Sequence, residues 1–172
     1  ERASKVYFKN FITPTSQTLF TLSNYITNMV IVLIQVTLLL VAATFFFFEG
    51  ILASLPLLIP ALLIITSIFL LLGITLGTIF RTEETSTITV ISLGFIFIFF
   101  SSAILPIETL PSVIKNIASF NPFYIAEILL NKIILFQASL KSVADQFLML
   151  GSYLVGVIAI TAIAKKTTKR KQ

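Results

Sequence analysis

The chain has 172 residues, of which 57% are hydrophobic and only 11% are charged. A soluble domain carries about 25% charged residues, and a soluble fold of this size could not bury so much apolar surface. The absence of Cys and His excludes disulfides, thiolate or imidazole metal sites and catalysis by either side chain. The net charge of +5 does not indicate nucleic-acid binding, because five of the twelve basic residues crowd the last eight positions. The composition predicts an integral membrane protein.

Four uncharged stretches of 39, 31, 23 and 19 residues divide the chain. Crossing the hydrocarbon core takes about 20 residues of helix, so each stretch provides one crossing. We therefore predict an all-α membrane protein, a single transmembrane domain over residues 1–172 with about four spans. The predicted spans are residues 15–48, 54–80, 85–105 and 146–164.

A short amphipathic helix is predicted over residues 1–12, ahead of Pro14. The residue before a proline avoids helical geometry, which separates this helix from the first span. Apolar residues recur on one face at helical spacing, and these are Ala3, Val6, Tyr7 and Phe11. The basic residues lie elsewhere around the helix, and these are Arg2, Lys5 and Lys9. A basic amphipathic helix beside a span either lies on the membrane surface or docks on a partner.

Residues 106–142 are too polar for a span and too apolar for an ordinary loop. Two proline-containing breaks separate two helical segments, predicted at residues 112–118 and 123–138. We expect two short helices folded partway into the membrane. Backbone of this kind is tolerated only where protein covers it or where it lines a cavity.

The basic residues predict an orientation. In a four-span arrangement nine of them fall on the side that holds both termini and the turn at Arg81, and three fall on the other side. The positive-inside rule then places both termini, with the basic tail at residues 165–172, in the cytoplasm. Residues 106–142 lie outside in this arrangement.

The chain lacks the residues that most enzyme mechanisms require. There is no Gly-x-x-x-x-Gly-Lys loop, so the chain does not bind ATP by that device. None of the seven carboxylates lies inside a predicted span, whereas ion-coupled transporters usually hold ionisable groups there. Glu108 and Glu127 are expected outside, beside the broken region, and a catalytic pair of the two is disfavoured.

Small and hydroxyl-bearing residues mark candidate packing or pathway positions. Gly73 and Gly77 are four residues apart and form a flat patch that admits a neighbouring helix, unless they are merely tolerated there. Five hydroxyl residues follow the third span, namely Thr85, Thr89, Ser92, Ser101 and Ser102. They either bond to the backbone of their own helix or form a mildly polar wall facing a partner subunit or a pathway.

The end of the third span and the segment after it carry a recognisable pattern. It has the form Pro-x-Glu-x-x-Pro followed by Asn-Pro, made by Pro106, Glu108, Pro111, Asn121 and Pro122. With the basic amphipathic segment, the long spans and the basic tail, this order resembles the permease subunit of ABC-2 type transporters. Ala103 stands where that family often has Gly. The resemblance aligns the chain with the C-terminal four-span part of such permeases, and together with the start at Glu1 it predicts that the first two spans precede this sequence.

The resemblance implies roles that composition does not. Residues 1–12 would be the cytoplasmic coupling helix against a separate ATP-binding subunit, with contacts from Arg2, Lys5, Val6, Tyr7, Phe8 and Phe11. Residues 107–140 would be re-entrant outer helices that cap the pathway. A second membrane subunit, identical or not, would complete the substrate route, and ATP would bind only to the partner, with no cofactor and no catalysis in this chain.

The expected function is thus a permease of an ATP-driven exporter in the cell membrane. Two alternatives stay open: a membrane scaffold or assembly protein that transports nothing, and a membrane-embedded enzyme acting on lipid. The lack of His, Cys and carboxylates within the predicted spans disfavours the enzyme.

Replacing Tyr7 and Phe11 together with Asp is expected to abolish transport driven by the partner, because carboxylates on the apolar face oppose its burial in a contact. The spans should remain folded. Transport and ATP hydrolysis of the assembled complex measure the coupling, and circular dichroism checks the helices. Coupling that survives the double substitution would contradict the role given to residues 1–12.

Overall fold

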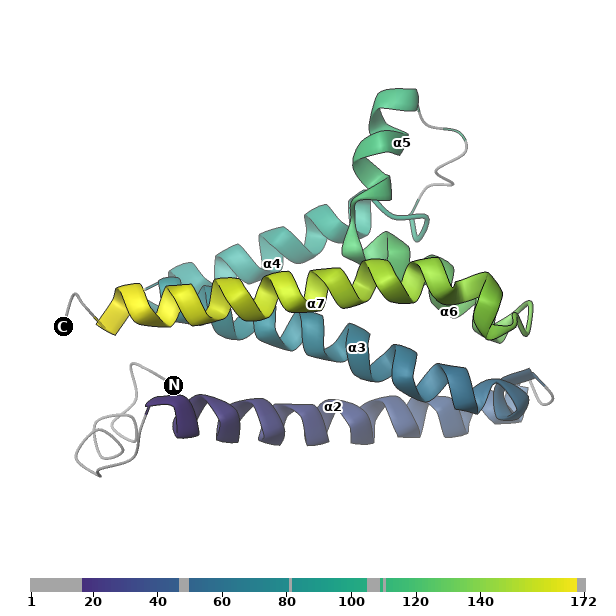
Figure 1. Cartoon of the computed structure of the whole chain (residues 1–172), viewed down its shortest axis with the longest axis horizontal. Coiled ribbons are helices and arrows are strands. Elements are labelled where there is room, and N and C mark those ends of the chain that lie inside the picture. The colour runs from purple at the N-terminus through teal and green to yellow at the C-terminus, as the bar shows by residue number, and fades with distance from the viewer. Residues whose placement is uncertain (1–16, 47–49, 81, 105–108, 110, 170–172) are drawn as a thin grey trace.

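The computed structural model describes residues 17–46, 50–80, 82–104, 109 and 111–169 of the chain. The predicted helix 1–12 and its contact residues lie outside this part. The described residues form helices and no strand (Figure 1), which confirms the predicted all-α fold. The helices are α2 (Gln17–Phe46), α3 (Gly50–Ile79), α4 (Glu83–Phe99), α5 (Ser112–Ser119), α6 (Pro122–Ile134) and α7 (Leu140–Lys169).

Three of these helices are long and apolar enough to cross a membrane. Their apolar stretches are Leu19–Phe45 in α2, Ile51–Ile79 in α3 and Leu140–Thr167 in α7. The starts of α2 and α4 and the end of α7 lie at one end of the bundle (Figure 1), as an even number of passes requires. Helix α3 begins before its predicted start and includes Pro56 and Pro60, which membrane helices accommodate.

The third predicted span is built differently from the others. Helix α4 has 17 residues and ends at Phe99, whereas the prediction extended it to residue 105. Helix α6, with 13 residues, continues along α3 where α4 stops. At 1.5 Å per residue, α4 and α6 together measure about 45 Å, the same as the 30 residues of α3. Two half-length helices therefore replace one continuous span, and α5 projects sideways from the break between them (Figure 1).

Contacts at both ends of α6 fix its place along α3. Phe69 of α3 makes edge-to-face contacts with Phe97 of α4 and Phe123 of α6, at centroid distances of 6.0 and 6.2 Å. At the other end, the Ser54 hydroxyl of α3 donates a hydrogen bond of 2.8 Å to the carbonyl oxygen of Ile133. Helix α6 thus runs from the level of Phe69 to the level of Ser54.

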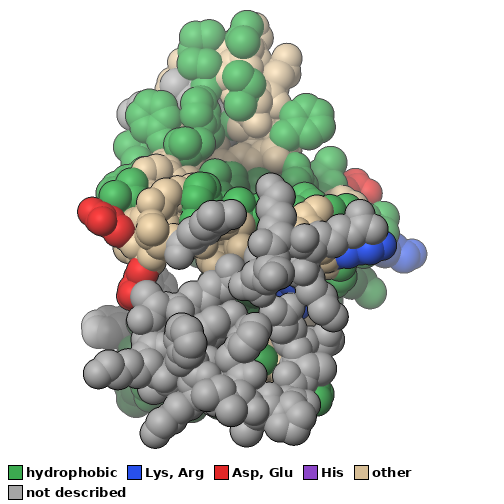
Figure 2. Space-filling model, turned by 90° about the vertical axis from the view of Figure 1, so that its left-hand side faces the viewer, with side chains coloured by type: hydrophobic (Ala, Val, Ile, Leu, Met, Phe, Trp, Pro, Cys, Tyr) green, Lys and Arg blue, Asp and Glu red, His purple; other side chains and the backbone are tan. Residues whose placement is uncertain are grey.

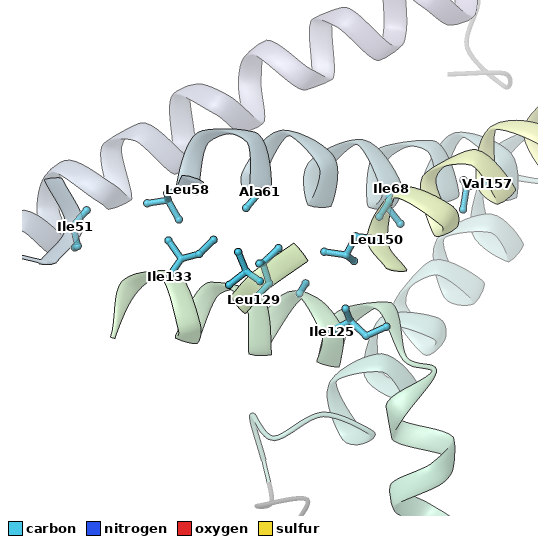
Figure 3. Close-up of a cluster of buried hydrophobic side chains, with 11 residues drawn as sticks. Ile51, Leu58, Ala61, Ile68, Ile125, Leu129, Ile133, Leu150 and Val157 are labelled. Atoms are coloured by element: carbon cyan, nitrogen blue, oxygen red, sulfur yellow. The ribbon is translucent and has the colours of Figure 1, made fainter. Parts of the chain in front are cut away.

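The buried core lies where α3, α6 and α7 meet (Figure 3). Leu58 of α3, Leu129 of α6 and Leu150 of α7 are almost completely buried in it. Buried residues of α7 recur every seven positions, at Val143, Leu150 and Val157, which is the spacing of a helix in left-handed packing.

Helix α3 also bonds to its neighbours through hydroxyl groups. The Tyr25 hydroxyl of α2 lies 2.8 Å from the Ser67 hydroxyl, and Thr75 lies 2.6 Å from Thr161 of α7. Side-chain hydrogen bonds between membrane helices contribute about 0.6 kcal/mol each. Together with the Ser54 bond to α6, they fix the register of three helices on α3.

Leu129→Ala is expected to lower the free energy of unfolding by about 2 kcal/mol, because the lost packing leaves a cavity at a fully buried site. Leu148→Ala is the matched control, since Leu148 is 72% exposed whereas Leu129 is 0% exposed. Thermal unfolding in mild detergent measures both. Equal effects of the two substitutions would contradict the described core.

Candidate functional site

The candidate site is the break at which α4 ends and α6 begins. Asn121 closes it from one side. Its amide nitrogen donates to the carbonyl oxygens of Phe97 and Phe100, at 2.6 and 2.7 Å. Its side-chain oxygen accepts from the backbone N–H of Phe123 at 3.0 Å, which caps α6, and Pro122 takes the first helical position. One buried side chain therefore satisfies the backbone of both helix ends.

Ser101, Ser102 and Glu127 close the break from the other side. The buried Ser101 hydroxyl donates to the carbonyl oxygen of Ile98 at 2.7 Å and accepts from the N–H of Ala103 at 3.2 Å. The N–H of Ser102 donates to a carboxylate oxygen of Glu127, Oε2, at 3.0 Å. The side chains of Ser101 and Glu127 thereby accept from the N–H groups of Ala103 and Ser102, which lie beyond the end of α4 and would otherwise need another partner in a membrane interior.

Glu127 lies at the depth of the middle of α3. Its position on α6 falls between Phe123, at the level of Phe69, and Ile133, at the level of Ser54. Figure 3 agrees, since Leu129 on the next half-turn faces Ala61 in the centre of α3. From the sequence, Glu127 is expected outside, beside a segment whose short helices fold partway into the membrane. In the structure α6 packs along the apolar helix α3.

A carboxylate at this depth requires an explanation. An acidic side chain at the centre of a membrane helix costs about 2.5–3.5 kcal/mol on an insertion scale. Glu127 is partly buried, and within the described part of the chain no Lys or Arg pairs with it. The α4 carboxyl end and the α6 amino end carry opposite partial charges that offset each other, so the helix ends do not compensate the carboxylate.

Helix α5 presents an apolar face next to the break. Val113, Ile117 and Phe120 recur at i, i+4 and i+7 and are 69%, 54% and 75% exposed. The Tyr153 hydroxyl of α7 donates to the carbonyl oxygen of Phe120 and ties the start of α6 to the bundle. Pro111 of the predicted motif precedes α5. Pro106 and Glu108 lie outside the described residues.

The predicted hydroxyl and glycine positions have different environments. The Thr89 hydroxyl donates to the carbonyl oxygen of Thr85 at 2.8 Å, which matches the interpretation of bonding to its own helix. Thr85 and Ser92 are exposed. A Cβ on Gly77 would lie 3.8 Å from the Ser86 hydroxyl of α4, whereas one on Gly73 would meet no heavy atom within 4 Å. No helix of the described chain therefore approaches Gly73 closely.

The start of α4 is a capped and solvated helix end. Thr82 accepts from the N–H of Thr85 at 3.3 Å, and Glu83 and Glu84 occupy the first turn, where negative charge is favourable. Figure 2 looks onto this end of the bundle and shows few charged side chains among hydrophobic ones.

A family model described as ABC-2 family transporter protein matches residues 1–163. The chain belongs to the ABC-2 transporter family. No curated protein and no solved structure matches it. The resemblance inferred from the sequence is thus confirmed, and the ABC-2 chain is a multi-pass membrane component whose family role is that of a permease.

Sequence reasoning singled out Asn121, Pro122, Ser101 and Ser102, and the structure of this ABC-2 chain brings all four to the break. It missed Glu127 as part of the same site. The signal was available in principle, since Ile125, Leu129 and Ile133 recur every four residues and predict that α6 packs on a long helix.

Asn121→Asp is expected to lower the free energy of unfolding by about 1–3 kcal/mol, because two buried carbonyl groups lose their donor. The cap on α6 should persist, since Asp caps helices as well as Asn does. Asn116→Asp is the matched control, because Asn116 is exposed on α5. Thermal unfolding of the two variants in detergent measures the difference. If both behave like wild type, Asn121 does not hold the break.

Proposed function

We propose that this chain is the transmembrane permease part of an ATP-driven exporter. It would form one wall of the substrate pathway and work with a separate ATP-binding subunit. The observation that carries the proposal is the family match over residues 1–163, nearly the whole chain. In this proposal the chain lies in the cell membrane with both ends of the segment in the cytoplasm, where the basic residues of the tail are favoured.

The described architecture supports a transport role over a purely structural one. A scaffold needs only continuous spans, which satisfy their own backbone. Here one crossing is interrupted, and its two halves are joined by side-chain bonds from Asn121 and Glu127. Transporters build binding and gating sites from discontinuous helices of this kind.

Helix α4 is the natural pathway wall in this proposal. None of its described side chains is buried, and its exposed residues include Thr85 and Ser92 as well as Ile88, Phe95 and Phe99. Its contacts within the described chain are with α3 and α6. A second membrane subunit facing α4 would enclose a route of mixed polarity, with the open surface at Gly73 free for close packing.

The test begins with purification of the full-length protein in mild detergent from its native host. We expect an ATP-hydrolysing subunit to accompany it, because the chain itself carries no ATP-binding loop. The double substitution of Tyr7 and Phe11 by Asp should remove this activity from the preparation while the permease remains folded. Exchange of Leu140 for Asp is the control, since Leu140 is exposed at the start of α7, at the end of the bundle opposite the start of α2 (Figure 1).

Two results would contradict the proposal. The first is recovery of the membrane protein with no ATPase under any gentle condition, which would favour the scaffold or assembly protein. The second is an ATPase that remains bound and coupled in the Tyr7 and Phe11 variant, which would leave the exporter in place but refute its coupling helix.

A further inference from the structure

A feature of Glu127 is left unexplained by the closure of the break. The hydrogen bond from the N–H of Ser102 needs only an acceptor oxygen, and the amide of Gln would supply one without a charge. A carboxylate at the depth of the centre of α3 is unfavourable unless its charge is used or compensated. Within the described residues, its second oxygen, Oε1, has no hydrogen-bond or ionic partner.

The surroundings of the carboxylate favour a positively charged ligand. The hydroxyl residues Ser101 and Ser102 lie at the same break, where the carbonyl groups of α4 already accept from Asn121 and Ser101, so that the charge of Glu127 is left for a ligand. Apolar residues of α4 and α5 flank the break and remain exposed, among them Phe99 and Phe120. A ligand that combines an N–H donor and positive charge with an apolar body would match both the carboxylate and the exposed apolar residues.

We propose that Glu127 is the binding site for an organic ammonium group of an amphipathic ligand, taken up at the break between α4 and α6. Oε1 of the carboxylate accepts from the ammonium N–H, while Oε2 keeps its bond to the N–H of Ser102. The apolar chain of the ligand lies against the exposed residues of α4 and α5. The inference rests on the proposed function in one respect only, namely that the ligand belongs to the class of substrates that the permease transports.

The first experiment uses wild-type full-length protein in phosphatidylcholine nanodiscs and the hydrophobic reagent dicyclohexylcarbodiimide. A protonated carboxyl group adds across one C=N bond of the reagent to give an O-acylisourea, which rearranges to a stable N-acylurea with no atom lost. Mass spectrometry should locate the adduct on Glu127. Dodecylammonium should reduce this labelling several-fold, and dodecanol, which has the same chain without the charge, should not.

The second experiment compares three proteins by thermal unfolding in the same nanodiscs. Dodecylammonium should raise the unfolding midpoint of wild type and of Glu84→Gln, because a ligand that binds the folded state stabilises it. It should not raise the midpoint of Glu127→Gln, which retains an acceptor for Ser102 but lacks the charge. Glu84 is the matched control because it is exposed at the start of α4, remote from the break.

Several results would overturn the proposal. These are the absence of a Glu127 adduct, an adduct whose yield dodecylammonium does not change, and equal stabilisation of wild type and Glu127→Gln. Because the labelling uses wild-type protein, an unstable Glu127→Gln variant does not remove the test. Neither experiment needs the ATP-binding partner. A negative result in them would refute the ammonium site without contradicting the exporter function, and failure to co-purify an ATPase would not contradict the ammonium site.

Discussion

The whole architecture depends on how the backbone is satisfied where α4 stops. A helix end within an apolar layer leaves carbonyl and N–H groups that lipid cannot pair. Asn121 supplies the donor for two of these carbonyl groups and the cap for α6, and Glu127 supplies the acceptor for Ser102. These few bonds permit a crossing made of two half-helices.

Helix α3 is the scaffold against which this arrangement is built. It contacts α2, α4, α6 and α7, and its hydroxyl groups bond to three of them. Because α4 and α6 share the length of α3 between them, the position of the break is set by where Phe69 meets Phe97 and Phe123. A rigid long helix thereby positions the interrupted crossing.

The same arrangement concentrates polarity where a transporter can use it. A carboxylate, two hydroxyl residues and the ends of two helices meet beside apolar surface on α4 and α5. For a member of the ABC-2 family, this places polar chemistry beside α4, a helix with no buried side chain among its described residues. The proposed exporter and the proposed ammonium site both follow from this one location.

The sequence by itself determined the membrane class, the helical fold, the family, and the positions of the three long helices, whose ends it placed within six residues of those in the structure. These properties depend on composition, on uncharged length and on a proline pattern, all of which are local along the chain. Asn121 was also marked among the residues that close the break, since Asn121-Pro122 is a local capping signal.

Only the tertiary structure decided how the third crossing is made and where Glu127 lies. By composition, residues 106–142 indicate only short helices outside or partway into the membrane, because 13 residues of α6 are too few for a span. Their depth depends on which helix they pack against, and that information is held in long-range contacts such as Ser54 with Ile133, which are 79 positions apart. The local sequence pattern therefore determined where the helices form, and packing between distant segments determined which residues meet at the site.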